Sequence, residues 1–179
     1  GLAPLYCVHG AEALLALEAA DAIRAAARRE GCTEREVFSA ELGADWARLG
    51  ASAANLSLFA SRRLLEIRIP SGKPGTEGGK AIEKLCARLP EDTVVLVTLP
   101  ELEWQQFKTA WFGALEEAGT VVEAKALSRE ELPQWLADRL AAQGQRAGLE
   151  ALEWMADRVE GNLLAAKQEV EKLALLAPP

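Results

Sequence analysis

The sequence lacks an excess of positive charge. Its 20 lysines and arginines are outnumbered by 27 acidic residues, so the formal net charge is -7. A simple nucleic-acid-binding protein is usually basic, because neutralising phosphates supplies most of its affinity. Any contact with DNA is therefore expected to be local or shared with partners.

Cysteine is also scarce, and long apolar runs are missing. Cys7, Cys32 and Cys86 are far apart and show no C-x-x-C spacing, which argues against a zinc site and a disulfide framework. Reduced thiols in a cytoplasmic protein are the expected state. No apolar run reaches the roughly 20 residues of a membrane span. The first four residues do not resemble a signal peptide, and they are typical of a chain cut or tagged upstream of its first strand.

What the sequence does contain is alternating strand and helix patterns, in a chain that is half hydrophobic. Strands are expected near residues 5–8, 37–40, 63–69, 93–99 and 120–123, with helices between them. This alternation predicts an α/β fold with a parallel sheet covered on both faces. In the third strand, Glu66 and Arg68 are expected to face solvent. Residues 71–79, rich in glycine, predict a flexible loop.

The pattern changes near residue 125, after which only helices are expected. Ser128 and Glu131 form a possible capping box, although Pro133 favours a helix that begins nearer to itself. Asn162 is expected to cap the last helix. The sequence thus predicts an α/β domain over residues 1–125 and a three-helix domain over residues 126–179.

This layout is common among P-loop ATPases, but the phosphate loop itself is missing. The first strand-to-helix junction, residues 9–13 (HGAEA), has no second glycine, no lysine and no Ser or Thr. Glu12 would also repel phosphate. We therefore expect no nucleotide-binding residues, no cofactor and no metal site. His9, the one histidine, is expected to be structural rather than catalytic, and no catalytic residue is predicted.

Two local features have more than one interpretation. Leu58 and Phe59 could enter the core, which the pattern alone favours, or form an exposed apolar plug for a partner. Residues 62–88 hold seven basic and three acidic residues, which indicates an ordinary solvated surface more strongly than a DNA-binding footprint.

Three segments, in order, resemble the delta subunit family of the bacterial DNA polymerase III clamp loader. Residues 56–62 (LSLFASR) are similar to its clamp-binding segment, and residues 160–173 (EGNLLAAKQEVEKL) to the signature of its helical domain. The opening strand, Gly10 and alanine-rich helix resemble its degenerate phosphate loop. Residues 111–112 and 132–135 also fall where the family carries similar residues.

The resemblance implies an AAA+-like domain with a degenerate P-loop, followed by a helical lid domain. It implies a subunit of the DNA polymerase III holoenzyme that is not catalytic by itself. The holoenzyme as an assembly is a DNA-directed DNA polymerase, which is a nucleotidyltransferase. Its role would be to bind and open the sliding clamp (beta) for loading onto primed DNA during replication. By position, Leu58 and Phe59 would be the plug, with Leu56 as a supporting contact and Ser57 shaping the turn.

The resemblance also implies further partners. The other clamp-loader subunits, gamma/tau and delta prime, would bind mainly through a C-terminal collar domain that this chain lacks. DNA would be contacted only within the assembled complex, and no membrane is expected. Two alternatives stay open: a degenerate P-loop ATPase, or a DNA-binding module of another complex.

Overall fold

The structure is a computed structural model that describes residues 1–41, 43–54 and 62–178. The chain divides into two compact units, Gly1–Lys125 and Ala126–Pro179, which are described separately. Within the described ranges, no helix is both long enough and apolar enough to cross a membrane.

The first unit is built around one parallel sheet of five strands, in the order β2-β3-β4-β1-β5. Its strands are β1 (Leu5–His9), β2 (Cys32–Ser39), β3 (Arg62–Arg68), β4 (Thr93–Thr98) and β5 (Thr120–Glu123). Its helices are α1 (Ala13–Arg29), α2 (Trp46–Ala54), α3 (Gly75–Ala87), the 3-10 turn η1 (Gln106–Lys108) and α4 (Ala110–Ala118). The strands alternate with helices, so the α/β class predicted from the sequence is confirmed.

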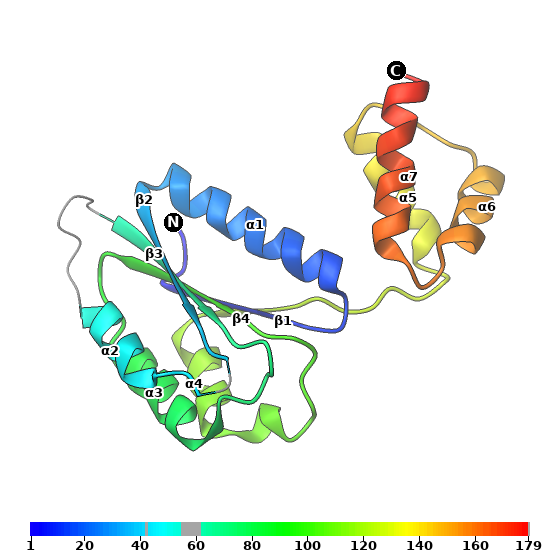
Figure 1. Ribbon diagram of the computed structural model, residues 1–179. Coiled ribbons are helices and arrows are strands. Elements are labelled where there is room, and N and C mark those ends of the chain that lie inside the picture. The colour runs from blue at the N-terminus through cyan, green and yellow to red at the C-terminus, as the bar shows by residue number, and fades with distance from the viewer. Residues whose placement is uncertain (42, 55–61, 179) are drawn as a thin grey trace. The chain divides into compact units, whose positions relative to one another are not determined.

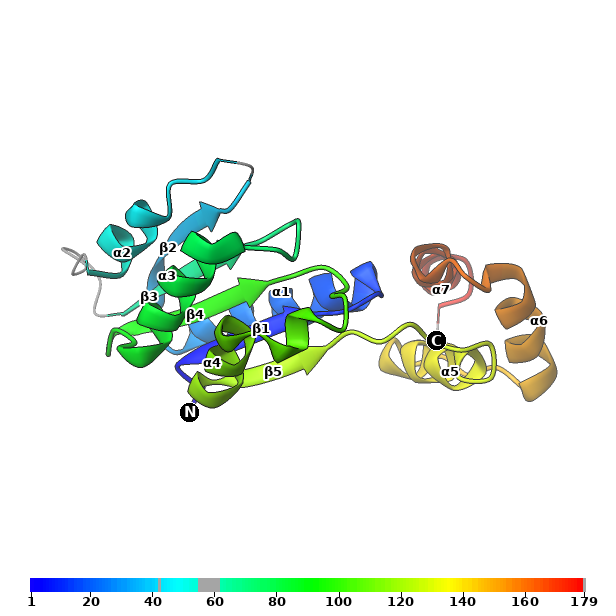
Figure 2. The ribbon, with the colours of Figure 1, turned by 90° about the horizontal axis from the view of Figure 1, so that it is seen from below.

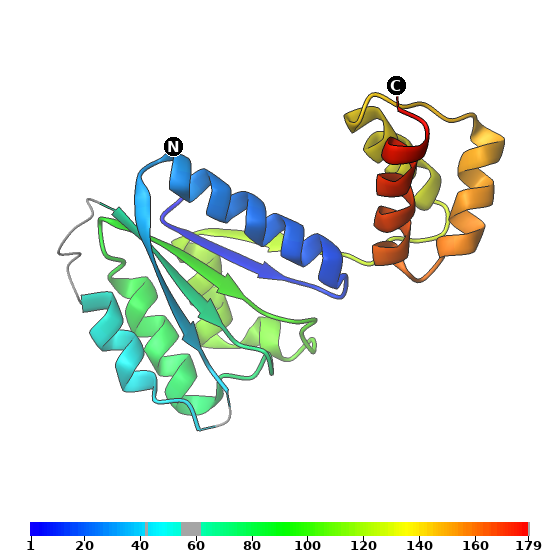
Figure 3. The ribbon, with the colours of Figure 1, turned by 45° about the horizontal axis from the view of Figure 1, so that its top comes forward.

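Helices cover the two faces of the sheet unequally. Helix α1 lies on one face, while α2, α3 and α4 lie on the other (Figures 1 and 3), and the view from below shows the latter three in front of the strands (Figure 2). Strand β4 is apolar toward both layers: Val94 and Leu96 pack with the α1 side, whereas Val95 and Val97 pack with the α3 side. This burial on two faces is what the continuous apolar run predicted.

Strand β3 differs from its prediction. Leu65, Ile67 and Ile69 are buried as expected, but Glu66 is 0% exposed, so the prediction that Glu66 faces solvent is wrong. Alternation shows which side chains share a face but does not show whether that face is covered. Here arginines from neighbouring elements cover Glu66, as described below.

The segment from residue 71 to residue 79 also differs from its prediction. Helix α3 begins at Gly75, so the second half of the expected loop is helical. Gly78 and Gly79 are buried, and an added Cβ at Gly78 would lie 2.5 Å from the ring of Trp46. These glycines allow close packing of a helix, which composition alone does not distinguish from a flexible loop.

The second unit contains three helices, α5 (Leu132–Ala142), α6 (Leu149–Val159) and α7 (Leu163–Leu176). Its core includes Leu136, Ala156 and Ala166, all 0% exposed. Helix α5 begins beside Pro133, which confirms the later of the two predicted helix starts. Glu131 Oε2 also accepts a 2.8 Å hydrogen bond from the Ser128 amide. Asn162 caps α7 as predicted, since its side chain accepts from the Ala165 amide at 3.0 Å.

Candidate functional site

The junction of β1 and α1 is where a P-loop ATPase would bind phosphate. Here the Glu12 carboxylate accepts a 3.2 Å hydrogen bond from the Leu14 amide, and the Glu12 amide donates to the Ala124 carbonyl at 3.0 Å. The first turn of α1 therefore carries its own anion and uses amides that would otherwise bind a ligand.

Gly10 shows that the same junction is also filled by backbone. Its φ of +138° favours glycine, and an added Cβ would lie 2.2 Å from the Ala124 carbonyl oxygen. The chain that leaves β5 thus packs directly against the loop after β1. Together with Glu12, this geometry opposes phosphate binding at the place where the fold would offer it.

His9, at the end of β1, lies in an aromatic cluster. It is 4% exposed and makes edge-to-face contacts with Phe107 and Phe112, at centroid distances of 5.5 and 5.7 Å. Burial lowers the pKa of His9, so the imidazole is neutral at physiological pH. This environment fits the structural role expected for the histidine.

The cysteines offer neither a metal site nor a reactive thiol. Burial raises the pKa of Cys7 to about 12 and that of Cys86 to about 11, so both stay protonated and are poor nucleophiles. No group of three or more His, Cys, Asp or Glu side chains that could hold a metal ion occurs in the described part of the chain.

The predicted clamp-binding residues Leu56, Ser57, Leu58 and Phe59 lie outside the described residues. The structure describes what flanks them: α2 ends at Ala54 before the segment, and β3 begins at Arg62 after it. One residue into β3, the side chain of Arg63 is buried and contacts the last turn of α2. The prediction that residues 62–88 form a solvated surface is therefore wrong for Arg63.

The basic stretch 62–88 does not form one surface. Arg63 lies on the sheet face of α2 and α3, whereas Arg68 bonds to Glu66 on the face of α1. Arg62 pairs with Glu30 at 3.2 Å and Lys73 with Glu103 at 2.8 Å. The described geometry therefore gives no support to this stretch as a single DNA footprint.

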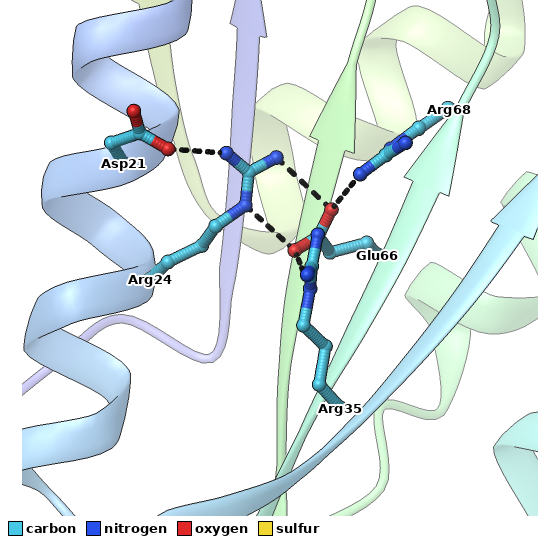
Figure 4. A network of polar contacts seen from close by, with 5 residues as sticks. All are labelled: Asp21, Arg24, Arg35, Glu66 and Arg68. Atoms are coloured by element: carbon cyan, nitrogen blue, oxygen red, sulfur yellow. Dashed lines mark hydrogen bonds and ion pairs between the residues drawn. The ribbon is translucent and has the colours of Figure 1, made fainter.

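On the α1 face, one carboxylate gathers three arginines. Glu66 accepts hydrogen bonds from Arg24 Nε and Nη2 at 2.7 and 3.0 Å, from Arg35 Nε at 2.6 Å and from Arg68 Nη2 at 3.2 Å (Figure 4). Asp21 holds Arg24 from its other side at 2.7 Å. Burial by itself would raise the pKa of Glu66, but these hydrogen bonds bring it down to about 2. The network ties α1, β2 and β3 together.

The family of the chain follows from comparison with known proteins. The family model described as "DNA polymerase III, delta subunit" matches residues 6–125. The chain belongs to this family. The DNA polymerase III subunit delta of Escherichia coli (strain K12) is 33% identical over 183 residues, and that of Haemophilus influenzae 30% over 181 residues. Each alignment covers 99% of this chain but only 52% of the relative.

A solved structure supports the fold. The Bacillus subtilis DNA clamp loader delta protein superposes with a TM-score of 0.74 at 23% identity, covering 99% of this chain and 54% of that one. The α/β fold with a parallel sheet, followed in the chain by three helices, is confirmed. The chain spans about half the length of the curated relatives it matches.

Proposed function

We propose that this chain is the part of a clamp-loader subunit that binds the sliding clamp (beta) and holds it open for loading onto primed DNA. The observation that carries the proposal is the family match over residues 6–125, a range that includes the segment 56–59. In this proposal Leu58 and Phe59 are the plug that enters the clamp, Leu56 is a supporting contact and Ser57 shapes the turn.

The plug would act through apolar burial in a pocket of the clamp. Full burial of a leucine or phenylalanine side chain contributes roughly 1.5–3 kcal/mol. Two such anchors contribute about 3–6 kcal/mol, on the order of a hundred- to ten-thousand-fold in affinity. The clamp opens if the chain binds the opened clamp interface more tightly than the closed one. A ligand shifts an equilibrium between two states only when it binds one state more tightly than the other.

In this proposal the chain does no chemistry itself. At the start of α1, the Glu12 carboxylate accepts from the Leu14 amide and the Glu12 amide donates to the Ala124 carbonyl. These contacts support a subunit that works without its own nucleotide. We assign assembly with gamma/tau and delta prime mainly to the part of the family that this chain does not span. DNA contact belongs to the assembled loader.

A titration against a bacterial sliding clamp tests the plug. Wild type is compared with Leu58→Ala/Phe59→Ala, and the matched control is Leu149→Ala/Leu164→Ala, which removes two exposed leucines from the second unit. We expect the plug variant to lose at least a hundredfold in affinity while the control binds as wild type does. Equal binding by all three proteins would reject the plug, and tight binding of Mg-ATP would reject the nucleotide-free role.

A further inference from the structure

The segment proposed to bind the clamp has described residues at both ends, and the side chain of Arg63, which follows the segment, contacts α2, which precedes it. Helix α2 ends at Ala54 and strand β3 begins at Arg62. Arg63 belongs to β3, where its amide donates to the Asp92 carbonyl at 2.9 Å, and its side chain reaches back to α2. Only 7% of that side chain is exposed.

The Arg63 guanidinium bonds in three directions. Nη2 donates to the carbonyls of Ser52 and Ala53, at 2.5 and 3.1 Å. Nε donates to Thr93 Oγ1 on β4 at 3.1 Å, and Nη1 meets Glu36 Oε2 on β2 at 3.3 Å. The cation therefore connects the end of α2 to three strands of the sheet.

The carbonyls that Arg63 binds, those of Ser52 and Ala53, lie in the last described turn of α2. Helix carbonyls point toward the C-terminal end and give it the negative end of the helix dipole. A buried cation is favourable at this position. Ser52 adds a second tie, because its hydroxyl donates to Glu36 Oε1 while its carbonyl accepts from Arg63.

We propose that Arg63 is a positioning residue for clamp binding: its buried guanidinium fixes the end of α2 against the start of β3, and so fixes both ends of the segment between them. The inference rests on the proposed function of that segment. A segment whose ends are held has fewer conformations to lose when it binds, and such preorganisation appears as affinity. Arg63 itself does not need to touch the clamp.

Lysine should not replace Arg63 fully. Its ammonium is a point charge with three donors on a flexible stem, whereas the planar guanidinium presents donors toward Thr93, Glu36 and the α2 carbonyls at once. Arg63→Lys therefore keeps the charge but loses part of the geometry. A purely electrostatic role would be rescued by lysine, and a positioning role would be rescued only in part.

Arg24 provides a matched control in the same sheet. It is also a mostly buried arginine, with 16% of its side chain exposed, and it bonds to Glu66 and Asp21 on the opposite face. Arg24→Gln should cost stability as Arg63→Gln does. It should leave clamp affinity unchanged, because neither of its partners adjoins the segment.

The experiment measures the dissociation constant of the whole chain for the sliding clamp, with thermal melting of each variant. A synthetic peptide of residues 54–62 reports what the segment binds without its anchors. We expect Arg63→Gln to weaken binding on the order of tenfold, toward the value of the peptide, with Arg63→Lys between it and wild type. Arg24→Gln should bind as wild type.

Two results would overturn the inference. One is wild-type affinity in Arg63→Gln, or in Arg63→Lys should the glutamine variant not fold. The other is an equal loss in Arg24→Gln, which would mean that general destabilisation explains the effect. The Leu58→Ala/Phe59→Ala variant separates the two proposals: if it loses binding while Arg63→Gln does not, the plug stands and only the positioning role fails.

Discussion

The two faces of the sheet each carry a buried charge, and the two charges are satisfied in opposite ways. On the α1 face, the anion Glu66 is surrounded by three cations, two of which are about half exposed. On the other face, the cation Arg63 is held mostly by neutral groups, the hydroxyl of Thr93 and two backbone carbonyls. The first arrangement joins secondary-structure elements, whereas the second fixes the ends of one segment.

The difference shows what each network can do. Side-chain partners such as Arg35 and Arg68 can move apart without unfolding a helix, so the Glu66 network acts mainly on stability. Two partners of Arg63 are backbone carbonyls of α2 itself, so loss of Arg63 releases the last described turn of that helix from the sheet. Stability should therefore depend on both networks, whereas clamp affinity should depend on the Arg63 network alone.

The largest effect is expected from Glu66→Ala. It removes the buried acceptor that Arg24, Arg35 and Arg68 share, and leaves the mostly buried Arg24 with Asp21 alone. We expect the free energy of unfolding to fall by about 3–5 kcal/mol, measured by urea denaturation. A loss below about 1 kcal/mol would show that the arginines find solvent easily and that the network is incidental.

Acid should remove the same charge without a mutation. The pKa of Glu66 is lowered from 4.5 to about 2, so its contribution is fully present above about pH 4.5 and is lost as the pH falls toward 2. We expect wild-type stability to decrease over that range. The decrease should be smaller in Glu66→Gln, which has no proton to take up; equal acid sensitivity would assign the effect to other carboxylates.

Arg63→Gln and Arg24→Gln should lower the free energy of unfolding by intermediate and similar amounts. Each loses several hydrogen bonds to charged or buried partners, which suggests a destabilisation of about 1.5–3 kcal/mol. Denaturant titrations of the two variants side by side provide the measurement. If Arg63→Gln proved far more destabilising than Arg24→Gln, the main role of Arg63 would be to stabilise the sheet and not to position the segment.

The smallest effect is expected from Arg68→Ala. Its side chain is 43% exposed and contributes one 3.2 Å contact, while Arg24 and Arg35 still hold Glu66. A loss of about 0.2–1 kcal/mol is expected, and it should shrink in high salt. A salt-independent loss of several kcal/mol would contradict the view that Arg68 is a peripheral member.

Periodicity predicted the order of strands and helices because each element carries its own apolar pattern. It did not predict the partners of Glu66, which lie 31 and 42 residues away for Arg35 and Arg24. A glutamate among apolar neighbours in a buried strand was the available signal. The prediction of a flexible loop was wrong at Gly78 for a related reason, because the role of this glycine depends on contact with Trp46, more than thirty residues earlier.

The candidate site illustrates the same limit. The pattern around Leu58 and Phe59 favoured the core, and only the family resemblance indicated a plug. Arg63 shares the alternation of Leu65 and Ile67, which places it on the buried face of β3, but alternation does not show which groups a buried arginine contacts. Its role depends on where α2 ends in space, which is a property of the folded chain.

The packing of Gly10 against Ala124 has a consequence for protein engineering. Inserting a lysine and a threonine after β1 would supply the side chains of a phosphate loop but not the space that a bound phosphate needs. The Ala124 carbonyl already accepts from the Glu12 amide at 3.0 Å, and it would lie 2.2 Å from any Cβ placed at position 10. An attempt to give this domain an ATPase cycle must therefore redirect the chain after β5 first, and only then change side chains.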